Sequence, residues 1–360
     1  MLPADRHPPL CAMPALTVLG TAQAYPGLPL TSAQLLQRLE SGFGLRLQRQ
    51  GLALARRLQV RSRYVARDFV ARLERPRPGC SNPDLAAQAL QGALRQAGLG
   101  VRDLAYVIGH TATPAEPLPS NISAVAQLLG YEGPLAEFRQ ACTGFINALL
   151  FAAGLCHYGD GRAVAIVGSE TGSLFFDPCR AGEDTAQLVN LLQMGDGAGA
   201  IILARATRDG APRLSAFYHG RLPGIYTPGL RMPAGGSAYP GLTTEVLEFA
   251  HDFQAIRQHG ERLFLAALDA ARAQDIDPAA LDAILPHQAN GQMDRLLAPY
   301  VPPGLPIIVH ADQVGNTGSA AMWLGLDYAR QQVLRPGQRL LLLGAESTNY
   351  SYGGCLYEHA

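Results

Sequence analysis

Three side chains of this sequence, a thiol, an imidazole and a carboxamide, have the chemistry to form and cleave acyl bonds. Cys142 opens a run of apolar and small residues that continues to Gly154 without a proline, which indicates a buried helix. A cysteine at or near the first turn of a helix meets unpaired N–H groups and the positive end of the helix dipole, and both favour the thiolate. The alternative is a buried cysteine that packs as a small hydrophobic residue.

The sequence contains an internal repeat, in which Asn316 occupies the position that corresponds to Cys142. In both copies a helix and a short apolar strand precede this residue, and a small-residue helix and a second apolar strand follow it. The imidazole of His287 stands at the end of the first strand of the second copy. The matched segments are Leu104–His110 with Leu281–His287, Cys142-Thr-Gly with Asn316-Thr-Gly, and Arg162–Glu170 with Gln338–Glu346.

This repeat predicts an α/β fold with two similar halves, residues 15–206 and 207–360, after a flexible tail at residues 1–14. Alternating strands and helices predict mostly parallel sheets that are covered by helices. Equivalent loops of a duplicated fold meet at a shared face. We therefore expect the thiol, the imidazole and the carboxamide to converge in one pocket.

The composition argues against several classes of function. Arg and Lys together number 29, and so do Asp and Glu, so no global charge favours nucleic acid or an anionic membrane as partner. The six cysteines show neither a CxxC motif nor metal-ligand spacing, which predicts a reduced cytoplasmic protein without a metal. The first 14 residues contain four prolines and no continuous apolar run, so we expect no signal peptide, and no segment is long enough for a membrane span.

Local patterns add detail to this plan. Ser81–Asp84 predicts the start of a helix, because it combines a capping residue, a proline and an acid. Ser32–Val60 is helical in pattern apart from a break at Ser41–Gly44. The arginine-rich stretch that follows includes Arg61 and Arg63. It is either a solvated surface or a contact for an anionic substrate carrier.

The connection over Gly220–Leu242 is rich in glycine and proline, with apolar residues between them. It is too long for a plain turn, and connections of this length are usually lids, binding loops or disordered segments. We expect it to cover an apolar tunnel.

Four motifs in this order resemble those of the β-ketoacyl-acyl-carrier-protein synthase III family, and the resemblance covers residues 15–360. These proteins are thiolase-fold condensing enzymes, so the resemblance implies a duplicated five-layered αβαβα fold with two pseudo-symmetric halves. It also implies a homodimer with a Cys–His–Asn triad in each subunit. The motifs are Ala141-Cys142-Thr-Gly-Phe145, Gly195-Asp-Gly-Ala-Gly-Ala200, Pro286-His287-Gln-Ala-Asn290 and Gly315-Asn316-Thr-Gly-Ser319.

The resemblance gives each of these side chains a role. Cys142 attacks an acyl thioester and forms an acyl-enzyme. His287 and Asn316 donate hydrogen bonds to the oxygen that gains charge when a second thioester becomes a carbanion. This requires a neutral imidazole, whereas a lone buried histidine is usually structural. Asn290 braces the loop beside the substrate. No cofactor or metal is implied, because both acyl groups arrive on the phosphopantetheine of acyl carrier protein or on coenzyme A.

Two departures from the family pattern bear on the substrates. The last active-site loop of the family is a run of glycines, but here Gly344–Gly354 has other residues where a backbone N–H must reach the acyl oxygen. We expect residues near Thr348 to supply that N–H, and Asn349 to tolerate a left-handed backbone. The only tryptophan, Trp323, does not match the aromatic residue that stacks on coenzyme A in the family. This favours substrates on a carrier protein.

Glu116 precedes Cys142 by 26 residues (142 − 116), on a loop that family members insert into the partner subunit's acyl tunnel. This resembles relatives that join two long acyl chains, in which a glutamate of this loop removes the α-proton in the neighbouring site. Dehydration in an apolar tunnel would raise the pKa of such a carboxyl group toward the useful range. The alternative is a solvated glutamate beside prolines. Leu118 would line the partner's tunnel and admit longer chains than a large aromatic residue.

The sequence thus predicts an acyltransferase, a ketosynthase of specialised lipid or polyketide biosynthesis that joins two acyl thioesters by Claisen condensation. Long-chain or β-ketoacyl substrates are expected. One alternative is transfer of the acyl group from Cys142 to an oxygen or nitrogen nucleophile. The other is a subunit of a heterodimeric synthase, although non-catalytic subunits typically lose the nucleophile that this chain keeps.

Overall fold

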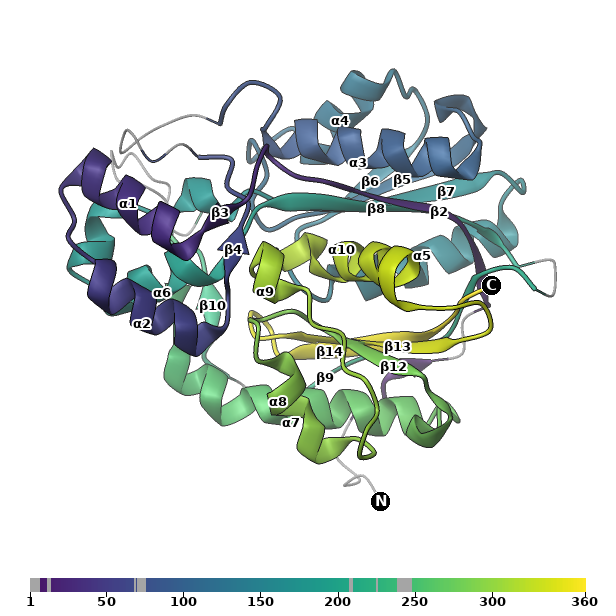
Figure 1. Cartoon of the computed structure of the whole chain (residues 1–360). Coiled ribbons are helices and arrows are strands. Elements are labelled where there is room, and N and C mark those ends of the chain that lie inside the picture. Colours follow the sequence, from purple (N-terminus) through teal and green to yellow (C-terminus); the bar gives the residue numbers. More distant parts are fainter. Residues whose placement is uncertain are drawn as a thin grey trace.

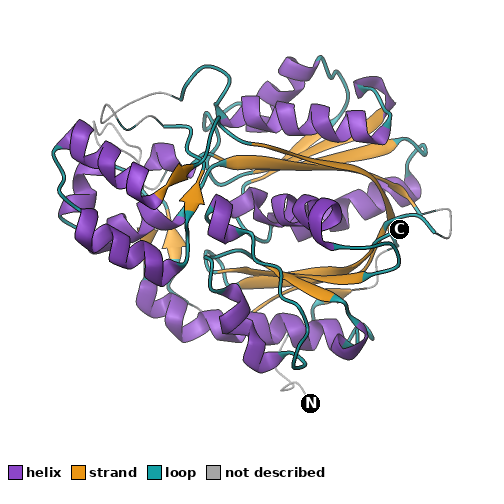
Figure 2. Cartoon of the chain, viewed as in Figure 1, coloured by secondary structure: helices purple, strands orange, loops and turns teal. Residues whose placement is uncertain are grey.

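The chain folds into five layers in which helices and sheets alternate (Figure 1). Figure 2 shows one sheet above and one below a central layer of helices, with further helices on both outer faces. The expected αβαβα fold is therefore confirmed. The computed structural model describes residues 7–11, 14–67, 69, 76–206, 210–224, 226–237 and 248–360.

Among the described residues, strands and helices alternate along most of the chain, as the sequence predicts, but strands follow one another directly between Gly197 and His251 and after Arg339. The strands are β1 (Leu10–Cys11), β2 (Leu16–Ala24), β3 (Leu30–Thr31), β4 (Ser62–Arg63), β5 (Leu104–His110), β6 (Leu135–Phe138), β7 (Ala163–Glu170), β8 (Gly197–Arg205), β9 (Arg213–Arg221), β10 (Leu230–Arg231), β11 (Ala250–His251), β12 (Ala283–Pro286), β13 (Arg339–Glu346) and β14 (Ser351–Glu358). The helices are α1 (Ser32–Phe43), α2 (Gln48–Leu58), α3 (Asn82–Ala97), α4 (Asn121–Leu129), α5 (Gly144–Tyr158), α6 (Thr185–Gln193), α7 (Phe253–Arg272), α8 (Met293–Leu297), α9 (Ala311–Val314) and α10 (Ala321–Tyr328), with a short 3-10 helix η6 (Gly318–Ala320) before α10.

One hydrogen-bonded path runs through both sheets and displays the internal repeat. Its order is β12-β13-β14-β9-β2-β8-β7-β5-β6, and it passes from one layer to the other where β2 meets β9. β5 and β7 are parallel neighbours in one sheet, and β12 and β13 are parallel neighbours in the other. The expectation of mostly parallel sheets is wrong, because β2, β8, β9 and β14 pair antiparallel with their neighbours along this path. Between the strands of each pair the chain passes through a central helix, α5 or α10. Outside the sheets, α3 and α4 cover one face and α7 covers the other.

The N-terminal segment is more ordered than the expected flexible tail. Leu10 and Cys11 pair antiparallel with His219 and Tyr218 of β9, so β1 adds a short strand to the lower sheet. Cys11 also packs against the hydrophobic cluster under α7. This pairing and burial oppose the entropy of a free chain end. Residues 1–6 and 12–13 of the expected tail lie outside the described residues.

Local sequence signals set the helix boundaries. Ser81 Oγ accepts the N–H of Asp84 at 3.3 Å, and the Asp84 carboxylate accepts the N–H of Ser81 at 3.1 Å, so a capping box begins α3 as predicted. The predicted break after α1 is confirmed at Gly44. Its φ of 68° is left-handed, a conformation that glycine adopts without strain.

The two central helices are apolar on all sides because a sheet covers each of their faces. Phe145 of α5 and Trp323 of α10 pack edge to face, with their ring centroids 6.0 Å apart. This contact fixes the two helices against each other. The turns that precede them carry Cys142 and Asn316.

His110, the repeat counterpart of His287, is a structural residue under α5. It is 1% exposed, and its Nε2 accepts the indole N–H of Trp323 at 2.7 Å. A Cβ on Gly144 would come within 2.5 Å of its Nδ1. The first residue of α5 must therefore be a glycine for the helix to reach this depth.

Candidate active site

Cys142 lies in the turn between β6 and α5 and is partly exposed, whereas both of its chain neighbours are buried. α5 begins at Gly144, so the cysteine stands just before the first helical turn. Thr143 is the N-cap residue, but its hydroxyl does not cap its own helix. The hydroxyl donates instead to a carboxylate from the other half of the chain, at 2.7 Å. The Cys142 turn is therefore held from outside its own half.

That carboxylate belongs to Glu346, the last residue of β13, which is 2% exposed. Its Oε2 accepts the backbone N–H and the hydroxyl of Thr143, both at 2.7 Å. Its Oε1 accepts the hydroxyl of Thr348. Three donors thus replace water around a buried carboxylate, which is what its burial requires.

The surroundings of Cys142 favour the thiol. Burial raises the pKa of Cys142 well above its usual range, and the carboxylates of Glu346 and Glu170 raise it further. The N-terminus of α5 acts in the opposite direction, but it is equivalent to only about half a positive charge. The expectation of a resting thiolate is therefore wrong. The position of Cys142 before a helix is visible in the local sequence, but the two carboxylates come from distant strands.

His287 follows β12 and is almost fully buried, with 6% of its surface exposed. Its backbone N–H donates to the carbonyl of Leu343 in β13 at 2.8 Å, which extends the parallel pairing of the two strands by one residue. Burial lowers the pKa of His287 to about 4, so the imidazole is neutral at pH 7. A neutral ring carries the single N–H donor that an oxyanion requires.

Asn316 follows α9, and its backbone is bonded to the segment after α6. Its N–H donates to the carbonyl of Gln193 at 2.8 Å, and its carbonyl accepts the N–H of Gly195 at 3.0 Å. A Cβ on Gly195 would lie 1.9 Å from the carbonyl oxygen of Val314, which explains the first glycine of the Gly195-Asp-Gly motif. Asn316 Oδ1 accepts the N–H of Gly318 at 3.0 Å. Because the side-chain oxygen accepts this bond, the NH₂ group on the other side of the amide points away from Gly318 and can donate elsewhere.

The Cys142 and Asn316 turns are neighbours in space. The hydroxyl of Ser319, in η6, lies 2.8 Å from the carboxylate of Glu170 at the end of β7. It also lies 3.2 Å from the carbonyl oxygen of Gln140, just before Cys142. The N-terminal ends of the two central helices therefore meet. Convergence of the three reactive side chains stays a prediction.

A cavity of about 590 Å³ opens beside the Cys142 turn. Its lining includes Ala141, next to Cys142, and also Glu346, Thr348 and Asn349 from the end of β13 and the loop after it. The connection that the sequence predicts as a cover supplies a further wall, from Pro228 to Gly236, while its residues 225 and 238–242 lie outside the described residues. Apolar lining residues are Phe175, Leu230, Met232 and Phe249.

The loop after β13 adopts its left-handed conformation at Tyr350, with a φ of 52°, and not at Asn349. Tertiary contacts hold Tyr350 in this conformation. It is 2% exposed, its hydroxyl donates to the carbonyl of Thr227 at 2.9 Å, and its carbonyl accepts the N–H of Leu222 at 2.9 Å. These bonds thus hold Tyr350 in a left-handed conformation that glycine would adopt without strain.

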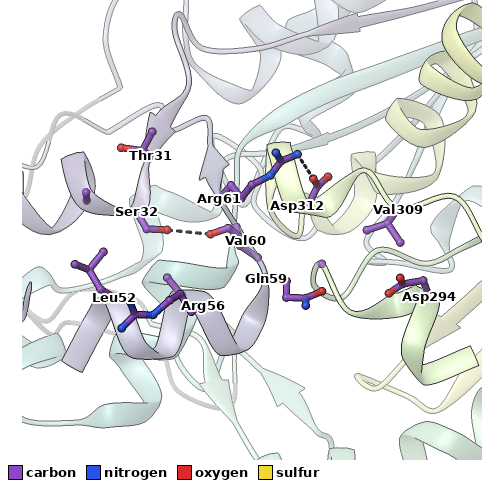
Figure 3. A pocket seen from close by; sticks show the side chains of 13 residues that line it. Thr31, Ser32, Leu52, Arg56, Gln59, Val60, Arg61, Asp294, Val309 and Asp312 are labelled. Atoms are coloured by element: carbon purple, nitrogen blue, oxygen red, sulfur yellow. Dashed lines mark hydrogen bonds and ion pairs between the residues drawn. The ribbon is translucent and has the colours of Figure 1, made fainter. Parts of the chain in front are cut away.

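A second cavity, of about 690 Å³, lies between α1, α2 and the loops at α8 and α9 (Figure 3). Arg61 lies at its edge and forms an ion pair with Asp312. Arg63 does not reach it, because its side chain is fully buried and donates to the carbonyl of Leu192 at 2.6 Å and to the hydroxyl of Ser32 at 3.0 Å. The predicted contact between Arg63 and a substrate carrier is contradicted, since the guanidinium is used inside the fold.

The remaining predicted residues lie on loops. Asn290 Oδ1 accepts the N–H of Gln292 at 2.9 Å and so braces the turn before α8. Glu116 and Leu118 are exposed between β5 and α4, Leu118 with 85% of its surface. Their chain neighbours Ala115 and Pro117 line the 590 Å³ cavity. Glu116 therefore stands at the rim of this cavity and, in the single chain, in solvent.

Two family models match this chain. Residues 136–220 match 3-oxoacyl-[acyl-carrier-protein (ACP)] synthase III, and residues 271–359 match the C-terminal model of the same synthase. The curated β-ketoacyl-[acyl-carrier-protein] synthase III 3 of Streptomyces coelicolor is 30% identical over 348 residues, which are 91% of this chain and 92% of that protein. The chain belongs to the β-ketoacyl-acyl-carrier-protein synthase III family.

Two further proteins are similar to this chain. The acetoacetyl CoA synthase NphT7 of a Streptomyces species is 31% identical over 275 residues, which are 72% of this chain and 79% of that protein. The solved structure of AbyA1, a tetronic acid condensing enzyme, matches with a TM-score of 0.83 at 27% identity and covers 95% of this chain and 99% of that one. The expected family of condensing enzymes is confirmed by these matches.

Glu346 and Glu170 are the residues of this site that sequence reasoning missed. A signal was present, because the two residues end matched segments of the repeat, Gly168-Ser-Glu170 and Gly344-Ala-Glu346. Within the described ranges, no group of His, Cys, Asp and Glu side chains is placed to hold a metal ion. None of the helices described there is long and apolar enough to cross a membrane.

Proposed function

We propose that this synthase III joins two acyl thioesters by Claisen condensation, with the first acyl group carried on Cys142. The observation that supports this is that the Cys142 and Asn316 turns meet at the N-terminal ends of α5 and α10. His287, which is neutral, follows β12, the strand that pairs with β13. In the first half-reaction the sulfur attacks the thioester carbonyl and the carrier thiol leaves. Because the resting group is a thiol, its proton passes first to His287 and then to the departing carrier sulfur.

In the second half-reaction a carbanion at the α-carbon of the second thioester attacks the acyl carbonyl, and the Cys142 sulfur leaves as product forms. Negative charge moves onto the thioester oxygen of the second substrate while its carbanion exists. The N–H of His287 and the NH₂ group of Asn316 are the donors that we assign to this oxygen. Loss of one such donor costs about 2.7–4 kcal/mol of transition-state stabilisation.

We propose long-chain or β-ketoacyl substrates of specialised lipid or polyketide biosynthesis. The apolar side chains that line the 590 Å³ cavity, among them Phe175 and Phe249, support an acyl chain as occupant. The similarity to a tetronic acid condensing enzyme supports a condensation reaction. Arg56, in the cavity of Figure 3, has no carboxylate partner among the described residues and offers a cation to the phosphate of a carrier or of coenzyme A.

We propose a homodimer that forms through β6. Among the residues that the structure describes, this strand has a neighbour, β5, on one side only, and such an edge pairs readily with another strand. Apolar surface lies close to it, with Leu128 52% and Phe151 38% exposed, and Phe151 packs on Phe138 of β6. Pairing of two β6 strands would bring the exposed loop of Glu116 and Leu118 toward the cavity of the partner. A heterodimer with a related chain is the competing arrangement.

Product analysis tests the proposed reaction. The purified protein is incubated with a long-chain acyl thioester and a second acyl thioester that carries ¹³C at its α-carbon. We expect a β-ketoacyl product in which the labelled carbon is bonded to the acyl carbonyl, detected by mass spectrometry. Transfer of the acyl group to added alcohols or amines, without a carbon–carbon product, would instead show an enzyme that acylates oxygen or nitrogen nucleophiles.

Glu116→Ala is expected to abolish condensation of donors that cannot decarboxylate, because no other group is assigned to remove their α-proton. Acylation of Cys142 should remain at the wild-type rate, since it requires no base at the α-carbon. Glu132→Ala, which removes an exposed glutamate from the turn after α4, is the matched control and should leave both steps unchanged. Unchanged turnover of Glu116→Ala would exclude the glutamate and favour decarboxylation of a malonyl-type donor.

A further inference from the structure

Two buried carboxylates, Glu346 and Glu170, occupy equivalent positions in the two halves and make the same set of bonds. Each ends the strand that follows a central helix, β13 or β7. Each uses Oε2 to accept the N–H and the hydroxyl of one residue, and Oε1 to accept a threonine hydroxyl. The donors are Thr143 and Thr348 for Glu346, and Ser319 and Thr113 for Glu170.

Each carboxylate bonds to the start of the central helix of the opposite half. Glu346 lies 203 residues from Thr143, the N-cap of α5. Glu170 lies 149 residues from Ser319, in η6 before α10. A negative group at a helix N-terminus accepts unpaired N–H groups and interacts favourably with the helix dipole. The two carboxylates therefore join the halves of the fold at the ends of their central helices.

Both carboxylates also bond to loops that line the cavity beside Cys142, but only the threonine partner of Glu346 lines the cavity itself. Thr113, the threonine partner of Glu170, is fully buried. The partner of Glu346, Thr348, lines the cavity together with Ala141, the residue before Cys142. The carboxylate of Glu346 thus connects the turn that carries Cys142 to the loop that carries Thr348. Residues 347–349 include no glycine, so side-chain bonds must fix this segment.

We propose that Glu346 is a positioning residue for acyl transfer, which holds the Cys142 turn against the Thr348 segment and sets the protonation of the thiol through its charge. The proposal rests on the proposed role of Cys142 as nucleophile. The two carboxylates then have different roles, a division of labour: Glu170 holds the start of α10, and Glu346 positions the turn that carries the reacting thiol.

The charges around the thiol support this assignment. Burial, then Glu346, then Glu170 raise the pKa of Cys142. The two histidines of this region carry no charge at pH 7, because burial lowers the pKa of His287 to about 4 and that of His110 to about 3. Among the charged groups around the sulfur, Glu346 therefore has the largest effect on the pKa of Cys142.

Glu346→Gln separates charge from geometry. The amide oxygen can accept both bonds from Thr143, and the amide NH₂ group can donate to the Thr348 hydroxyl, so the shape of the site is kept while the charge is lost. Removal of a negative charge lowers the pKa of a neighbouring thiol, and each unit of decrease raises the thiolate fraction about tenfold. We expect Cys142 to react with iodoacetamide at least about threefold faster at pH 7.5 than in the wild type, with the pH profile moved to lower pH. Mass spectrometry of the Cys142 peptide measures this rate.

Glu170→Gln is the matched control, because the same bonds are kept at the other helix. Its effect on the alkylation rate should be smaller, since Glu170 contributes less to the pKa of Cys142 than Glu346 does. Glu346→Leu removes the bonds and leaves three donors unpaired. We expect acylation by a long-chain thioester to fall at least tenfold in kcat, with KM changed much less, because the apolar residues that line the cavity, Phe175 and Phe249 among them, remain to bind the chain.

An alkylation rate and pH profile of Glu346→Gln equal to those of the wild type would overturn the proposed effect of charge. An effect of Glu170→Gln as large as that of Glu346→Gln would overturn the division of labour. If Glu346→Leu does not fold, the glutamine variant still decides. If the wild-type protein is alkylated on Cys142 but is never acylated there, the proposed function fails, while the alkylation comparison still tests the role of Glu346.

Discussion

Cys142→Ala is expected to abolish acylation of this protein by every acyl thioester, and with it all turnover. The sulfur is the only nucleophile that we assign to the first half-reaction, and neither His287 nor Asn316 can take its place as the carrier of the acyl group. Intact-protein mass spectrometry should show one acyl adduct on the wild type and none on the variant. Peptide mapping should place the adduct on Cys142.

Cys179→Ala is the matched control for this experiment, because Cys179 is exposed and lies outside the site. It should be acylated as fully as the wild type. A wild-type protein that stays unacylated across short, medium and long chains would contradict the covalent mechanism. An adduct that persists in Cys142→Ala would move the nucleophile to another cysteine.

Asn316→Asp is expected to lower the kcat of condensation about 10²–10³-fold, the range found when one donor to a developing oxyanion is removed. The carboxylate keeps an oxygen for the N–H of Gly318, a bond of 3.0 Å in the wild type, so the turn retains its support. It lacks the NH₂ donor and adds a negative charge beside the forming enolate. Acylation of Cys142 should continue, because that step uses other donors.

Single-turnover measurements separate the two steps. Acyl-enzyme should still form in Asn316→Asp, slowed far less than condensation, and should then persist when the second thioester is added. Equal losses in both steps would mean that Asn316 supports the Cys142 turn and does not stabilise the enolate. Asn316→Ala, which loses the bond to Gly318 as well, shows how much of any loss comes from the turn.

Much of the fold can be predicted from the sequence, because its signals are local or repeated. The capping box of Ser81 and the left-handed turn at Gly44 each depend on residues within one helical turn. The layers follow from the repeat, because two copies of one strand and helix pattern must bury their apolar faces in the same way. The repeat also places Cys142 and Asn316 at equivalent turns, which the structure brings together.

Details that depend on distant contacts cannot be read from local patterns. The bond between Glu346 and Thr143 spans 203 residues, so nothing near Cys142 in the sequence indicates the charge that acts on it. Arg63 belongs to an arginine-rich stretch typical of a surface, but the carbonyl of Leu192, 129 residues away, accepts its bond inside the fold. Likewise, intrinsic preference favours a left-handed Asn349, whereas tertiary anchors place that conformation at Tyr350.

The most direct test of convergence at one site is a crystal structure of the acylated enzyme with a non-reactive analogue of the second thioester. We expect the acyl group on Cys142, with its chain in the cavity beside Thr348. His287 and Asn316 should each place a side-chain nitrogen about 2.7–3.2 Å from the carbonyl oxygen of the analogue. An acyl group in another cavity, or donor nitrogens that point away from that oxygen, would contradict the proposed condensation.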